Sequence, residues 1–150
     1  MDLNKSICSA TVEVFQTMLM MDAVPGDPLT GRKAHHSNSV SGIVGIAGPS
    51  KGMVAIHIPE QTALKITSSF LCMEVSSIDE DVKDAIGELA NMVAGSIKAD
   101  LLDGKDYKLS IPSVVNGVEY EIECLSESQG GIVPFSVDGG EFIVEFHLQG

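Results

Sequence analysis

The stretch Ser77–Asp103, SIDEDVKDAIGELANMVAGSIKADLLD, has the hydrophobic spacing of one long helix. Its apolar side chains recur at helical intervals and share one face: Ile86, Leu89, Ala90, Val93 and Ile97. At about 100° per residue, a second set lies within roughly 60° of one another on the other side of the helix: Asp84, Glu88, Asn91 and Gly95. The spacing therefore predicts a helix that packs on a sheet and turns a narrow polar stripe outward.

The ends of this helix carry their own signals. Ser77, with Glu80 three residues later, has the spacing of a capping box, and acidic side chains suit the positive end of the helix dipole. Gly104 is a natural stop. These signals predict that the helix begins at Ser77 and ends at Asp103.

Shorter helices and several strands are predicted around it. The helices are Lys5–Met21 and Pro59–Met73, and Asp22–Asn38 between the first helix and the first strand is predicted to be a loop, in part a short strand. The strands are Val40–Ala47, Met53–Ile58, Lys108–Val115, Val118–Leu125, Gly131–Val137 and Glu141–Leu148. Short turns, among them Asn116-Gly117 and Asp138-Gly139-Gly140, imply antiparallel pairing. We therefore predict a single α+β domain over residues 1–150, a largely antiparallel sheet with long helices on one face.

Composition narrows the function. The 150 residues are 44% hydrophobic and carry a net charge of -12, which fits one compact core and disfavours binding to a nucleic-acid backbone. The amino terminus has no basic region, and the apolar stretch near Phe15 is too short to cross a bilayer, so we expect a cytoplasmic protein with no membrane partner. The cysteines form no CxxC pair, and His35 and His36 lack evident further ligands, so no metal site is expected.

On residue types alone, the polar stripe could be an ordinary solvated helix face. Its spacing, Asp84-x-x-x-Glu88-x-x-Asn91 within DAIGELANMVAG, resembles the signature of the CheC/CheX family of chemotaxis phosphatases, in which Glu and Asn three apart on an exposed helix form the active site. SGIVGIAGPSKGMVAIHIPEQTALKIT resembles the family's Gly-rich hairpin and middle helix, and GGEFIVEFHL resembles its C-terminal strand. The resemblance covers most of the chain and is weakest over Asp22–Asn38.

The first helix repeats the stripe in altered form. Ser9, Glu13 and Gln16 have the spacing of the second stripe, which suggests a duplicated helix-plus-hairpin unit. The resemblance to the family implies that the two units are related by pseudo-twofold symmetry. In the family, CheC-like members keep the motif on both helices and CheX-like members on the second only. Gln16 stands where Asn is expected, and its extra methylene moves the amide by about a C–C bond length. The chain therefore resembles a CheX-like, single-site member, and the first stripe is treated as vestigial.

The resemblance implies dephosphorylation of the aspartyl phosphate of a CheY-type receiver. The receiver would supply Mg²⁺ and a Lys, so the protein needs no cofactor of its own and mainly places a water in line. Asn91 is implied to orient that water. Glu88 would be repelled by the phosphoryl group and is better used in an ion pair with the receiver's Lys.

The remaining residues of the stripe are assigned less directly. Asp84 could bind the partner, orient Glu88 or simply keep the helix soluble. Gly95 is expected to let a partner loop approach the helix, whereas Gly87 could serve either that purpose or packing inside the protein. Lys83 or Lys98 could assist the approach of an acidic receiver.

Two other functions stay open at this point. The chain could be a catalytically silent binding module that docks on a receiver or on a signalling or flagellar partner, although a carboxamide at Asn91 beside Glu88 argues for catalysis. It could also be a structural homodimer component with no dependence on phosphorylation. A homodimer is expected in either case, because family members pair through sheet edges and the C-terminal hairpin strands are predicted to be exposed.

Overall fold

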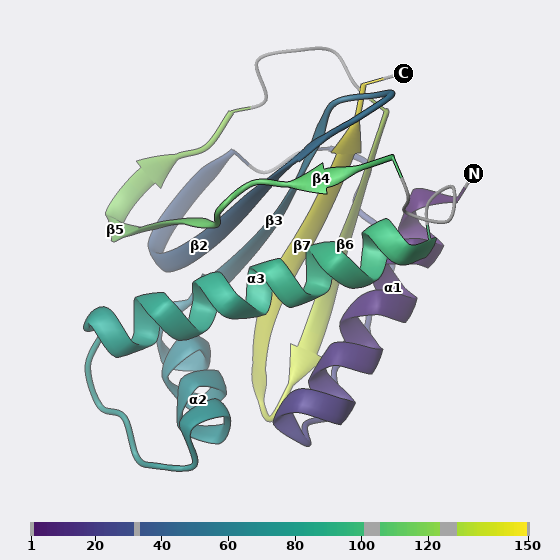
Figure 1. The fold of residues 1–150 in the computed structure, drawn as a ribbon. Coiled ribbons are helices and arrows are strands. Elements are labelled where there is room, and N and C mark those ends of the chain that lie inside the picture. The colour runs from purple at the N-terminus through teal and green to yellow at the C-terminus, as the bar shows by residue number, and fades with distance from the viewer. Residues whose placement is uncertain (1, 32–33, 101–105, 124–128, 150) are drawn as a thin grey trace.

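A computed structural model describes residues 2–31, 34–100, 106–123 and 129–149 (Figure 1). In these residues the chain forms α1 (Leu3–Val14), a π-helical turn (Phe15–Leu19), β1 (Val24–Pro25), β2 (His35–Ala47), β3 (Gly52–Pro59), α2 (Glu60–Leu71), α3 (Glu80–Asp100), β4 (Lys108–Leu109), β5 (Ser113–Glu121), β6 (Gln129–Val137) and β7 (Gly140–Leu148). None of the helices in this part of the chain is long and apolar enough to cross a membrane.

The strands form one antiparallel sheet in the order β1-β6-β7-β3-β2-β4, and β5 also pairs with β2. The helices cover one face of it (Figure 1). Glycines on that face lie beneath them, Gly42 of β2 under α3, Gly131 of β6 under α1 and Gly140 of β7 under α2. The predicted α+β class, with helices on one face of a largely antiparallel sheet, is confirmed.

Aromatic rings fill the space between the helices and the C-terminal hairpin. Phe15 and Phe142 stack with their ring centroids 4.8 Å apart, and Phe142 stacks in turn on Phe135 at 5.1 Å. All three side chains are fully buried. Burial of such large apolar surfaces is the main stabilising contribution of this core.

Helix α3 approaches the sheet closely because β2 carries a glycine beneath it. A Cβ at Gly42 would lie 2.9 Å from the Cβ of Ala90 and 3.1 Å from the carbonyl oxygen of Ile86. Only a residue without a side chain fits there. The small pair Gly42 and Ala90 thus sets both the distance of α3 from the sheet and its rotation about its own axis.

The start of α3 differs from the prediction. The helix begins at Glu80, and the N-cap is Asp79, whose carboxylate accepts a hydrogen bond from the backbone N–H of Val82 at 3.1 Å. The predicted capping box at Ser77 is therefore wrong, because the carboxylate of Asp79 lies closer to the first turn. The predicted end at Asp103 and the stop at Gly104 lie outside the described residues.

The predicted hairpin at Asn116-Gly117 is also wrong. Both residues lie within β5, where Asn116 pairs with Val40 and Gly117 with Ser39 of β2. An isolated Asn-Gly pair favours a turn, but the long partner strand β2 stabilises an extended backbone here instead. The turn predicted at Asp138-Gly139-Gly140 is confirmed, with φ of 46° at Asp138 and 81° at Gly139.

Two further expectations change at the sheet edges. Strand β2 starts at His35 rather than Val40, so His35 and His36 belong to a strand and not to a loop.

Strand β7 lies between β6 and β3, and β6 pairs with β1, so the C-terminal hairpin is not a free edge. The longest edge strand among the described residues is β5. It ends at Glu121, and the predicted continuation to Leu125 enters residues that the structure does not describe.

The face of the sheet away from the helices carries a chain of buried polar groups. The Ser41 hydroxyl lies 2.8 Å from the Tyr120 hydroxyl and 2.7 Å from Nδ1 of His57. The other ring nitrogen of His57 bonds the Glu145 carboxylate, which also receives Nε2 of His147 at 2.6 Å. Burial raises the pKa of Tyr120, so its hydroxyl keeps its proton and can donate to Ser41. These bonds link β5, β2, β3 and β7 side to side.

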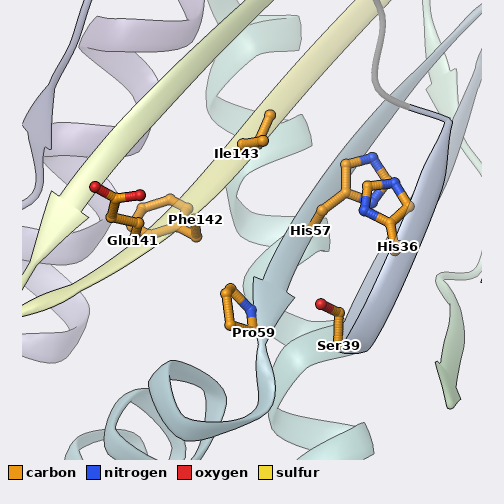
Figure 2. A pocket seen from close by; sticks show the side chains of 7 residues that line it. All are labelled: His36, Ser39, His57, Pro59, Glu141, Phe142 and Ile143. Atoms are coloured by element: carbon orange, nitrogen blue, oxygen red, sulfur yellow. The ribbon is translucent and has the colours of Figure 1, made fainter. Parts of the chain in front are cut away.

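A third imidazole, that of His36, lies against this set of hydrogen-bonded side chains. The rings of His36 and His57 stack with centroids 4.0 Å apart and planes 19° apart. Figure 2 shows the two rings lying against each other. Both side chains are buried. They border a cavity of about 110 Å³ that Ser39, Pro59 and residues of β7 complete. The histidines therefore act together as packing and hydrogen-bonding groups of the sheet.

We predict that Gly42→Ala destabilises the protein by about 1–3 kcal/mol, because the new methyl group meets the Cβ of Ala90 and the backbone of Ile86. Urea unfolding of the variant and the parent measures the difference. Gly117→Ala is the matched control, since its Cβ would make only ordinary contacts, 3.7 Å from Cδ1 of Tyr120 and 3.9 Å from the carbonyl oxygen of Glu119. Equal midpoints for the two variants would contradict the close packing of α3.

We predict that Glu145→Gln lowers the free energy of unfolding by about 1–3 kcal/mol, because His57 and His147 bond different oxygens of the carboxylate and the substitution replaces one of these two acceptors by an NH₂ donor. Thermal or urea unfolding at neutral pH gives the measurement. Glu141→Gln, an exposed site on the same face of β7, is the control and should change little. If both variants lost the same stability, the buried chain would not be a stabilising element.

Candidate active site

The structure brings the polar stripe of α3 to the surface as one set. Asp84 and Glu88 are exposed, Asn91 and Gly95 are half-buried, and the apolar face of the same helix is buried against the sheet. The orientation follows from the tight contact at Gly42, because a helix held there by Ala90 must turn its opposite side outward. The predicted common face is confirmed, whereas the role of each residue stays a prediction.

The two glycines near the stripe differ in surroundings. A Cβ at Gly87 would lie 3.2 Å from Cγ2 of Val114 and 3.7 Å from Cγ of Pro112. Gly87 therefore serves packing of α3 against the start of β5. A Cβ at Gly95 would meet only Cδ1 of Leu109, at 4.0 Å, so there is space beside the helix at that position.

Asn91 opens onto a groove between α3 and the segment from β4 to β5. The groove has a volume of about 580 Å³ and is lined by Asn91, Lys98, Lys108, Leu109, Ser110, Ile111 and Pro112. The sequence predicts Lys98 near the stripe but does not predict that the β4–β5 segment lies beside it. Ile111 and Pro112 fall within the predicted strand Lys108–Val115, and a strand pattern does not indicate which helix is its neighbour. The structure has two strands here, β4 and β5, with residues 110–112 between them.

The functional groups of the stripe are available for a partner. Within the described part of the chain, the side chains of Asp84, Glu88 and Asn91 make no hydrogen bond or ion pair. Lys83 instead contacts Glu80 at 3.5 Å within the first turn of α3. A neutral carboxamide and a carboxylate one turn apart thus face outward, and neither is committed to the fold.

The corresponding stripe on α1 has a different geometry. Ser9 and Glu13 are exposed on α1, but Gln16 lies in the π-helical turn Phe15–Leu19. A π-turn closes its hydrogen bonds over a longer interval and so shifts the angular position of its side chains. Gln16 therefore departs from the second stripe both in length and in helix geometry.

The hydrogen-bonded polar side chains on the other face of the sheet do not form a second accessible site. Ser41, His57 and Glu145 are nearly inaccessible to solvent. Among the residues that the structure describes, no three His, Cys, Asp or Glu side chains are grouped so that they could hold a metal ion. The chemistry that this surface can offer lies at Asn91 and Glu88, where a carboxamide can hold a water by donating and accepting hydrogen bonds.

Comparison with known proteins places this chain in a family. Residues 40–136 match the model of the family described as chemotaxis phosphatase CheX. The CheY-P phosphatase CheX of Thermotoga maritima is 30% identical over 120 residues, which cover 79% of this chain and 77% of that protein.

Solved structures agree along the whole chain. A CheC-like superfamily protein from Shewanella sp. PV-4 has a TM-score of 0.89 and 34% identity, covering 100% of both chains. The CheX–CheY–BeF₃–Mg²⁺ complex from Borrelia burgdorferi contains a chain with a TM-score of 0.81 and 25% identity, with 99% of each chain covered. The outward stripe lies on the helix that the family match includes, and the chain belongs to the CheX family of chemotaxis phosphatases.

Proposed function

We propose that this protein dephosphorylates the aspartyl phosphate of a CheY-type receiver, with Asn91 orienting the attacking water. One observation carries the proposal: among the described residues the carboxamide of Asn91 makes no hydrogen bond, and it lines an open groove one helical turn from the carboxylate of Glu88, which likewise has no partner there. The T. maritima relative named CheY-P phosphatase and the B. burgdorferi complex with CheY support the choice of substrate.

In this reaction the protein itself forms no covalent bond to the phosphoryl group. A water oxygen attacks phosphorus, the bond from phosphorus to the aspartyl oxygen breaks, and the aspartate leaves as a carboxylate while the proton passes to phosphate. An acyl phosphate has a good leaving group, so the main gain comes from placing the water in line. The amide of Asn91 is neutral and is not repelled by the phosphoryl oxygens. Mg²⁺ belongs to the receiver side of the complex, and this chain contributes no cofactor.

Glu88 and the flanking residues serve docking. A carboxylate beside a phosphoryl group is repelled, so Glu88 acts best on a cation of the receiver, its active-site Lys, and holds the register of Asn91. Asp84 lies a turn further toward the start of α3 and is exposed, suited to contact with the same partner. The open space beside Gly95 lets a loop of the receiver approach the helix backbone.

The alternative is a catalytically silent module that binds a receiver or a signalling or flagellar partner through this surface. Both functions use the stripe, but only catalysis requires a carboxamide at position 91. Turnover separates the phosphatase from the binding module. Dependence of binding on receiver phosphorylation separates both from a purely structural component.

We predict that Asn91→Ala removes the acceleration of dephosphorylation, a loss of about 10²-fold or more, because the water is no longer positioned. Release of phosphate from a phosphorylated CheY-type receiver with Mg²⁺ gives the rate. Binding to a receiver loaded with BeF₃⁻ and Mg²⁺ should persist in Asn91→Ala and weaken in Glu88→Ala.

Gln16→Ala is the matched control for this experiment, since it removes a carboxamide from the corresponding position of the first stripe. Its rate should equal that of the parent within about twofold. Dephosphorylation no faster than the receiver's own rate in the parent protein would favour the binding module. Equal rates for Asn91→Ala and the parent would refute the assignment of the water-positioning role.

We also propose that the protein is a homodimer that pairs through β5. This strand is long, lies at the sheet edge and exposes Val115 and Val118, and unpaired edges favour strand addition. Sedimentation equilibrium should give twice the 15.8 kDa mass of the chain. Val118→Lys should shift the mass toward the monomer, whereas a monomeric parent protein would end the proposal.

The internal repeat is likewise a proposal. Each of α1 and α3 is followed by a two-residue strand, β1 or β4, and later by a hairpin, β2–β3 or β6–β7. The short strand of each half pairs with the hairpin of the other half, β1 with β6 and β4 with β2. This reciprocal pairing supports a duplicated unit. Superposition of the two halves tests it, and failure of the hairpins to align together with their helices would count against it.

A further inference from the structure

We propose that the groove beside Asn91 is the receiver's docking groove, in which Ile111 is the apolar anchor and Lys98 and Lys108 bind carboxylates of the receiver. The inference rests on the proposed function and names the surface that selects the partner. It adds a second wall to the site, contributed by the β4–β5 segment rather than by α3.

The position of the groove makes contact with the receiver unavoidable. Asn91 itself lines the groove, so a protein whose phosphoryl group reaches Asn91 covers the neighbouring surface as well. Lys98 lies seven residues further along the same side of α3, about 10 Å from Asn91 at 1.5 Å per residue. A specific protein interface is much wider than this distance, so a receiver that contacts Asn91 also covers Lys98.

The charge of the groove contrasts with that of the chain. The protein carries a net charge of -12, with only nine Lys and Arg residues, yet two lysines lie together in this groove. Neither Lys98 nor Lys108 forms an ion pair within the described part of the chain. The groove therefore fits an acidic segment. A receiver that holds Mg²⁺ beside its phosphorylated aspartate carries carboxylates there, because carboxylates are the usual protein ligands of Mg²⁺. The lysines also reduce the repulsion between two acidic proteins.

Ile111 has the features of a preorganised anchor. Its side chain is 89% exposed. The residue before it is tied to β2 in two ways, because the backbone N–H of Ser110 donates to the carbonyl oxygen of Gly45 at 2.9 Å and the Ser110 hydroxyl accepts from the N–H of Gly45 at 2.8 Å. Pro112 follows and fixes the backbone on the other side. Because the backbone around Ile111 is held in this way, little backbone entropy is lost when the residue binds a partner.

The occupant is thus a receiver segment next to its phosphorylation site, with a carboxylate for the lysines and an apolar depression for Ile111. A second copy of this chain is the competing occupant, since β5 begins two residues after Ile111. The two occupants predict different responses to the same substitution, one in receiver affinity and the other in molecular mass.

The test compares Ile111→Ser with Val24→Ser, an exposed apolar residue on β1 at the opposite edge of the sheet. Affinity is measured by titration with a receiver loaded with BeF₃⁻ and Mg²⁺, and kcat and KM by phosphate release. We expect Ile111→Ser to weaken binding and raise KM about five- to tenfold while kcat stays within twofold, and Val24→Ser to change neither. Unchanged urea unfolding verifies that both variants are folded.

A charge-reversal pair tests the cationic part of the groove. The double variant Lys98→Glu and Lys108→Glu should slow association with the receiver about tenfold at low salt, and the effect should shrink as salt rises. The double variant Lys5→Glu and Lys51→Glu makes the same change in net charge on exposed residues outside the groove. Equal slowing by the two double variants would reduce the effect to net charge and overturn the inference.

The outcomes separate this inference from the proposed function. Loss of turnover in Asn91→Ala with unchanged receiver affinity in Ile111→Ser would overturn the groove and leave the phosphatase. Ile111-dependent binding of the loaded receiver without any turnover would support the groove and remove the phosphatase. A lower molecular mass for Ile111→Ser, with receiver affinity intact, would assign the groove to a second copy and overturn the inference.

Discussion

The close contact between α3 and β2 decides the rest of this structure. A helix normally stands off a sheet by the length of its side chains, but Gly42 has none and Ala90 only a methyl group, so the two backbones come together. Gly87 repeats the arrangement against the start of β5. A helix held at two small residues cannot rotate without a clash, and its outward side is therefore determined. The orientation of the polar stripe is a consequence of core packing.

This rigidity suits a surface that works by placement. A water-positioning amide gains its effect only if its place relative to the phosphoryl group is reproducible. Asn91 sits on the middle of α3, on a helix buried along its opposite face, rather than on a loop. The β4–β5 segment beside it is tied down through Ser110 and Gly45, so both walls of the groove are held by the sheet.

The face of the sheet away from the helices is stabilised differently. There the strands are joined by Ser41, His57 and Glu145 in a buried chain of hydrogen bonds, extended by the hydroxyl of Tyr120. Buried polar groups stabilise a fold only when they form hydrogen bonds. These side chains can form theirs only when the four strands are paired in this register, so the hydrogen bonds favour this register over others. Because β2 and β5 belong to this chain, it also helps to hold the strands against which α3 and its stripe are placed.

The sequence by itself determined the class of the fold, the outward stripe and the family. The helical period is local, so the common face of Asp84, Glu88 and Asn91 follows from spacing alone, as does the turn at Asp138 and Gly139. Where a local turn or strand signal competed with pairing to a distant segment, only the tertiary structure decided which conformation formed. Asn116-Gly117 became part of a strand because β2 lies beside it, and Ile111 joined Asn91 in one groove because the sheet brings β4 next to α3. Contacts between residues far apart in the chain depend on how the elements pack, and residue spacing along the sequence does not predict them.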